Sequence, residues 1–88
     1  MTETTLIALG FNKEFIDSDY YYVKTIGDVE LITQVSDAIR DENDWFVQFY
    51  EYGSFTFTES EPLKQLVQLL ENSLIKDFYT MESAHINN

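Results

Sequence analysis

The stretch FIDSDYYYVKTIGDVELITQVS, residues 15–36, decides the fold because it predicts a β-hairpin. Residues 15–26 and 29–36 are rich in β-branched and aromatic side chains, which favour strands. Between them lie Gly27 and Asp28, a pair of residues typical of a tight hairpin turn. An antiparallel sheet is therefore expected in the middle of the chain.

Two further strands are predicted downstream of this hairpin. Residues 45–52, WFVQFYEY, form the third, and residues 55–58, FTFT, form a short fourth strand after Gly53 and Ser54. Residues 37–44 are mostly charged, which is typical of a solvated loop or a helical turn. Because the connections are short, neighbouring strands are expected to be antiparallel.

Helices are predicted at both ends of the chain. Thr2 is a candidate N-cap and Gly10 a stop signal for a short first helix with Leu6, Ile7 and Leu9 as its apolar side. Downstream of Ser60, apolar residues recur at helical spacing and predict a long helix of about 27 Å that covers one face of the sheet. The residues of this stripe are Leu63, Leu66, Val67, Leu70, Leu74 and Phe78.

The predicted fold class is therefore α+β, with a short N-terminal helix, an antiparallel sheet of about four strands and a long C-terminal helix packed on one face. All 88 residues are expected to belong to one domain, 1–88, because the length suits one hydrophobic core. From about residue 80 the chain shows no apolar pattern and is expected to be frayed.

Seven of the thirteen residues from 45 to 57 are aromatic, and they cannot all face the same side of a sheet. Trp45, Val47 and Phe49 share one side of the third strand. The other side takes Phe46, Gln48, Tyr50 and Tyr52. A single long helix covers one face. The second set of rings is therefore either accommodated by the first helix together with cross-strand ring pairing, or it forms a protein interface. The triple tyrosine at 20–22 raises the same two alternatives.

The charge balance excludes some partners and favours others. Five Lys and Arg residues against sixteen Asp and Glu give a net charge of −11. A nucleic acid backbone and an anionic membrane would repel such a chain, so neither is an expected direct partner. A basic protein surface, including the nucleic-acid-binding surface of an effector or nuclease, would attract it. The alternative is that the charge serves solubility alone.

The spacing of the acids indicates how such a contact could be made. Asp17 and Asp19 are two residues apart, as are Asp28 and Glu30, and on an extended chain each pair lies about 6.6 Å apart on one face. That distance is close to the one between neighbouring phosphates of a nucleic acid strand. A second group precedes the aromatic strand and consists of Asp37, Asp41, Glu42 and Asp44. The competing interpretation is a solvated face with turn-forming aspartates.

No motif for catalysis, metal binding or cofactor binding is present in the sequence. The chain has no cysteine, and His85 has no histidine or cysteine partner at metal-binding spacing. Residues 41–52 begin like a calcium-binding loop, but Phe46 and Tyr52 stand where that loop needs Gly and Glu. We therefore expect a protein that is not an enzyme and has no catalytic residues, metal site or cofactor. The absence of cysteine and of a signal-like segment predicts a cytoplasmic protein, in the host-cell cytoplasm if it is phage-encoded.

In size, charge sign and lack of active-site motifs, the chain resembles the small acidic inhibitors encoded by phages and mobile elements, such as anti-CRISPR proteins and DNA mimics. The resemblance implies an inhibitor that occupies a basic, nucleic-acid-binding surface. One alternative is an immunity or antitoxin-like protein that neutralises a basic toxin, and another is a structural adaptor that forms a homodimer. The predicted partner-binding residues are Asp17, Asp19, Tyr20, Tyr22, Asp28, Glu30, Asp37, Asp41, Glu42, Asp44, Tyr50 and Tyr52.

Overall fold

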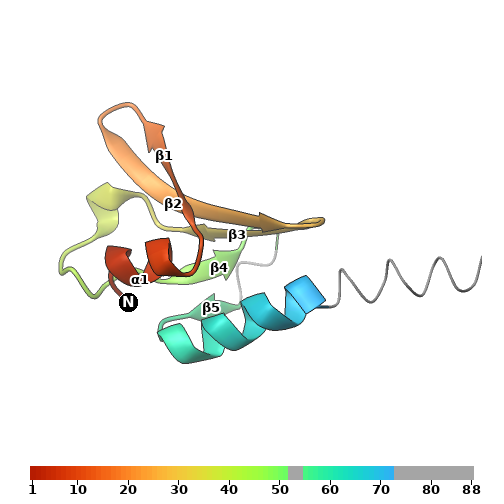
Figure 1. Ribbon diagram of the computed structural model, residues 1–88. Coiled ribbons are helices and arrows are strands. Elements are labelled where there is room, and N and C mark those ends of the chain that lie inside the picture. Colours follow the sequence, from red (N-terminus) through yellow and green to blue (C-terminus); the bar gives the residue numbers. More distant parts are fainter. Residues whose placement is uncertain (52–54, 73–88) are drawn as a thin grey trace, which may run out of the picture.

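The computed structural model describes residues 1–51 and 55–72. Five antiparallel strands form one sheet in the order β1-β2-β3-β4-β5, so each strand pairs with the next one along the chain (Figure 1). The strands are β1 (Asn12–Ile16), β2 (Asp19–Ile26), β3 (Val29–Thr33), β4 (Val47–Phe49) and β5 (Thr56–Phe57). The helical segments are α1 (Glu3–Ala8), the 3-10 helix η1 (Ser36–Ala38) and a helix over residues 60–72. The predicted α+β class and antiparallel sheet are confirmed.

The expected first strand, residues 15–26, proves to be parts of two strands. Ile16 pairs with Asp19, so Asp17 and Ser18 form a two-residue turn between β1 and β2. Asp17 has a φ of 56°, in the left-handed region that aspartate tolerates better than most residues. The sheet consequently has five strands instead of the predicted four or so, because the hairpin formed by β1 and β2 was read as a single strand.

The second hairpin has the predicted turn. Ile26 pairs with Val29, which leaves Gly27 and Asp28 as the turn, and Gly27 has a φ of 60°. Strands β4 and β5 are shorter than the predicted ranges 45–52 and 55–58. The charged segment between β3 and β4 contains the helical turn η1.

Both helices lie on the same side of the sheet, below β2 and β3 in the view of Figure 1. Their buried residues join those of the strands in a single core. Trp45 lies inside this core, with its ring 5.3 Å from that of Tyr22 in an edge-to-face arrangement. The core residues are Leu6, Phe11, Tyr22, Ile26, Leu31, Trp45, Val47, Leu63 and Val67. We call this side of the sheet the covered face.

The N-terminal segment is anchored at several points. Thr2 caps α1 as predicted, since its hydroxyl accepts a hydrogen bond from the backbone N–H of Thr5 at 3.3 Å. The ammonium group of Met1 donates hydrogen bonds to three backbone carbonyls, at 2.8, 2.7 and 3.3 Å. These carbonyls belong to Asn43, Trp45 and Thr58, so the contact joins the start of the chain to the segments beside β4 and β5.

The C-terminal helix is described over residues 60–72, which span about 20 Å at 1.5 Å per residue. The rest of the predicted length of about 27 Å lies outside the described residues. Leu63 and Val67 are buried in the core, and Leu66 and Leu70 pack against it. Leu74 and Phe78 of the predicted stripe, and the tail expected to fray from about residue 80, lie outside the described residues.

Replacing Leu63 by Ala should lower the free energy of unfolding by about 2–5 kcal/mol, because the side chain is fully buried between helix and sheet. The matched control is Leu69→Ala on the same helix, where the side chain is 62% exposed and the expected change is within about 0.5 kcal/mol. Urea denaturation of both variants measures the difference. Equal losses would contradict this packing of the helix.

Candidate functional site

The face of the sheet opposite the helices has no described element packed on it, and we call it the open face. Its members follow from the strand register, because alternate residues of a strand point to opposite sides. At its centre Val23 lies between Asn12 and Ile32, and Ile32 lies beside Gln48. By register and alternation the open face comprises Asn12, Glu14, Ile16, Asp19, Tyr21, Val23, Thr25, Glu30, Ile32, Gln34, Phe46, Gln48, Tyr50 and Thr56.

An apolar band runs across the middle of the open face. Tyr21, Val23, Ile32 and Phe46 are partly exposed, and Tyr50 is 63% exposed. One alternative from the sequence was that the first helix packs over these rings. That alternative is wrong, because α1 lies on the covered face. Aromatic and aliphatic side chains left on an open sheet are a common mark of a protein interface.

The open face carries acids, and none of the cationic side chains in residues 1–51 and 55–72 belongs to it. Lys13 and Lys24 alternate onto the covered face. The ammonium of Lys13 lies 3.9 Å from the ring centre of Tyr20, and that of Lys24 lies 3.6 Å from a carboxylate oxygen of Glu71. The remaining described cationic side chains belong to the loop before β4 and to the C-terminal helix, at Arg40 and Lys64. The field over the open face is therefore negative.

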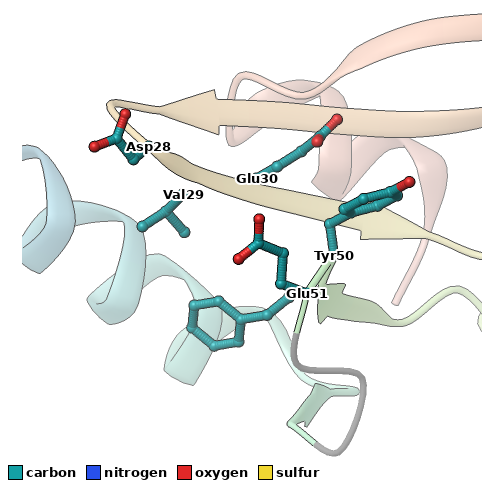
Figure 2. A pocket seen from close by; sticks show the side chains of 6 residues that line it. Asp28, Val29, Glu30, Tyr50 and Glu51 are labelled. Atoms are coloured by element: carbon teal, nitrogen blue, oxygen red, sulfur yellow. The ribbon is translucent and has the colours of Figure 1, made fainter.

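A hollow lies at one end of the sheet, next to the open face. A cavity of about 100 Å³ lies between the start of β3 and the end of β4, and it is lined by Asp28, Val29, Glu30, Phe49, Tyr50 and Glu51. Figure 2 shows Glu30 on β3 and Tyr50 directly after β4, with the carboxylate of Glu51 near them. The backbone N–H of Tyr50 donates to the carbonyl of Glu30 at 2.9 Å, which keeps the two residues opposite each other. Three carboxylates beside two rings suit a cationic side chain.

This cluster does not have the arrangement of a metal site. Within the two described ranges of the chain, no group of three or more His, Asp or Glu residues could hold a metal ion. The hollow is also small and open, whereas sites for small molecules are deep and mostly apolar. The geometry therefore favours contact with a protein surface.

Some acidic side chains of the loop before β4 accept hydrogen bonds from the backbone of the same loop. One carboxylate oxygen of Asp44 accepts hydrogen bonds from the backbone N–H groups of Arg40 and Asp41, at 3.2 and 2.9 Å. The side chain of Asp41 accepts one from the N–H of Asn43 at 3.1 Å. Asp37 and Glu42, which were predicted with them, are exposed. Asp44 and Asp41 therefore stabilise the loop, whereas Asp37 and Glu42 are accessible to a partner.

The proposed phosphate-like pairs need correction. Asp17 lies in the tight turn and Asp19 is the first residue of β2, so the two do not share an extended strand. Asp19 also accepts a hydrogen bond from the hydroxyl of Ser36 at 3.0 Å. Asp28 likewise lies in a turn, so its spacing to Glu30 is not that of a strand. The two pairs are at opposite ends of β2, about 23 Å apart at 3.3 Å per residue. The acids border the open face and do not form a continuous track.

Two of the predicted tyrosines belong to the core side. Tyr22 is 1% exposed and its hydroxyl donates to a carboxylate oxygen of Glu3 at 2.8 Å, so it cannot contact a partner in this fold. Tyr20 is partly exposed, but its ring stacks on Trp45 at 5.9 Å. The register turns these two rings toward the helices and Tyr21 toward the open face. Tyr52 lies outside the described residues.

Sequence reasoning missed several members of the open face, namely Glu14, Val23 and Ile32. The side chains of residues 12–16 alternate between the two faces of the sheet, and this alternation would have placed Glu14 on the open face. It becomes recognisable only after Asp17 and Ser18 are identified as a turn. Tyr21, the middle residue of the triple tyrosine, was not assigned to the binding surface.

Comparisons of the chain with family models, with curated proteins and with solved structures give no significant match. Among the described residues, no helix has both the length and the apolar character that crossing a bilayer requires.

The position of Tyr22 predicts a loss of stability in alkaline solution. Burial and the hydrogen bond to Glu3 raise the pKa of the Tyr22 hydroxyl above its usual value of 10.0. The unfolded chain therefore loses this proton near pH 10 while the folded chain keeps it, so the free energy of unfolding falls as pH rises above 10. The expected slope is about 1.4 kcal/mol per pH unit for one group.

Tyr22→Phe should reduce this slope, as measured by urea denaturation between pH 9 and pH 11. Tyr50→Phe removes a hydroxyl from a ring that is 63% exposed, and it should leave the slope unchanged. A slope that is the same in Tyr22→Phe as in the parent chain would contradict the buried position of this hydroxyl.

Proposed function

We propose that this chain is a small non-enzymatic inhibitor whose open face docks on a basic, nucleic-acid-binding surface of another protein. The observation that carries the proposal is the composition of that face. It combines exposed or partly exposed aromatic rings with carboxylates, it lacks described cationic side chains, and no described element covers it. Such a face attracts Lys and Arg and offers apolar area against which their stems can pack.

Contacts of two kinds would hold the partner. The hollow beside Tyr50 suits one Lys or Arg side chain, which would meet the carboxylates of Glu30 and Glu51 and an aromatic ring. The band around Val23 and Ile32 would supply the apolar centre of the interface. Charge then steers the encounter, and the rings provide the anchor.

The same composition argues against the self-associating adaptor. Two copies meeting through their open faces would bring together two surfaces of the same sign, each on a chain of net charge −11. Like charges placed opposite each other in an interface are destabilising. The immunity-like alternative uses the same face but does not require a nucleic-acid-binding partner, and competition with nucleic acid separates the two.

Reversing the acids of the open face should abolish partner binding. Glu14→Lys with Glu30→Lys changes the net charge from −11 to −7, since each substitution adds +2. The tagged variant and parent are used to recover partners from a nuclease-treated lysate at low salt, followed by a salt gradient. The parent should retain a nucleic-acid-handling protein that duplex DNA displaces and that salt elutes, because salt screens exposed charges.

The matched control carries Glu59→Lys and Glu61→Lys, which make the same charge change at the start of the C-terminal helix, outside the open face. It should keep the partner. Equal loss or equal retention in the two variants would refute the open face as the docking site. A recovered toxin that DNA does not displace would favour the immunity-like function.

A further inference from the structure

Strand β1 is a free edge of the sheet. It pairs with β2 on one side, no described strand pairs with its other side, and all five of its residues are exposed. Figure 1 shows β1 at the edge of the sheet, starting beside α1 and ending away from both helices. The opposite edge strand, β5, has only two residues, so β1 offers the longer edge. Backbone groups along an unpaired edge can pair with another chain.

The backbone groups that β1 presents outward can be identified from β2. The N–H groups of Tyr20 and Tyr22 donate toward β3, to the hydroxyls of Ser36 and Thr33 at 3.0 and 2.9 Å. Since successive backbone groups of a strand alternate in direction, Asp19, Tyr21 and Val23 face β1 and bond to Ile16, Glu14 and Asn12. The groups of the two remaining residues, Lys13 and Phe15, therefore point away from the sheet.

The side chains of β1 indicate the chemistry of an added strand. Phe15 and Ile16 are 70% and 51% exposed, so an added strand would cover apolar area on both sides of the edge. Glu14, two residues before Ile16, lies together with it on the open face and attracts a basic residue. The ammonium of Lys13 is on the other side of the strand, over the ring of Tyr20 at 3.9 Å, and does not neutralise Glu14.

A second copy of this chain fits the edge poorly. Two β1 strands can pair antiparallel so that the outward backbone groups of Lys13 in each copy meet those of Phe15 in the other. The symmetry axis of this pairing passes through Glu14, and the two Glu14 carboxylates then lie directly opposite each other. Like charges in this position destabilise a strand pair. The net charge of −11 on each copy adds to the repulsion.

We propose that β1 takes an extended basic segment of the partner as a sixth strand of the sheet, with a Lys or Arg beside Glu14 and an apolar residue beside Phe15. The basic character of the segment rests on the proposed function, whereas the strand addition is a separate claim about this edge. Main-chain hydrogen bonds would supply affinity, and the alternating side chains would supply specificity.

Amide hydrogen exchange tests this proposal residue by residue. The probe is a blocked peptide of alternating valine and lysine, added at about 1 mM to detect weak binding. Exchange of the Lys13 and Phe15 amides should slow by about tenfold or more, whereas the amides of Glu14 and Ile16, already bonded to β2, should change little. A matched peptide of alternating valine and glutamate should have no effect.

Phe15→Pro should abolish the slowing of exchange that the peptide causes at Lys13. The substitution removes an outward N–H that does not bond to β2, and an edge strand tolerates proline at such a position. Phe15→Ala keeps the N–H and should still show slowed exchange at Lys13. Spectral changes confined to open-face residues such as Tyr21 and Tyr50 would refute the strand addition while leaving the proposed function intact. Unchanged exchange at Lys13 and Phe15 in the presence of the peptide would also refute the strand addition. If exchange at these two amides slows when the protein concentration alone is raised, the occupant of the edge is a second copy of the chain.

Discussion

Packing of both helices against one face of the sheet is the constraint on which the rest of the structure depends. Leu6 of α1 and Leu63 of the C-terminal helix are each fully buried and belong to the same core as Tyr22 and Trp45. Once both helices are committed to this side, no described element remains to cover the other. A sheet of five short strands is thus stabilised from one side, and no described element covers its other side.

The same one-sided packing sorts the charges of the described chain. Lys24 pairs with Glu71 of the helix, Lys13 lies over Tyr20, and the Met1 ammonium is bound by backbone carbonyls. No cationic side chain of the described residues belongs to the open face. The chain has sixteen acidic and five basic residues, and with Lys13 and Lys24 on the helix side the described charges of the open face are all negative. We propose that its rings and carboxylates, together with the free edge of β1 beside them, contact a basic partner.

Periodicity and turn signals were sufficient to predict the fold class, the Gly27-Asp28 hairpin and both helices. The turn at Asp17 could not be predicted in this way, because Asp-Ser is a weak turn signal and aromatic residues continue on both sides of it. That missed turn also affected the candidate site. It concealed β1, removed Glu14 from consideration, and suggested that Asp17 and Asp19 share an extended strand. Whether a tyrosine such as Tyr22 is buried or accessible to a partner depends on the face of the sheet against which the helices pack. Strand alternation alone does not determine that face.

Side-chain methyl accessibility of the full chain in solution tests the central claim most directly. In an NMR experiment with a soluble paramagnetic probe, the methyl groups of Val23 and Ile32 on the open face should relax strongly, and those of Leu31 and Val47 in the core should be protected. These pairs lie on the same or neighbouring strands and differ chiefly in the face to which they point. Equal protection of all four would mean that the open face is covered, and would contradict the account.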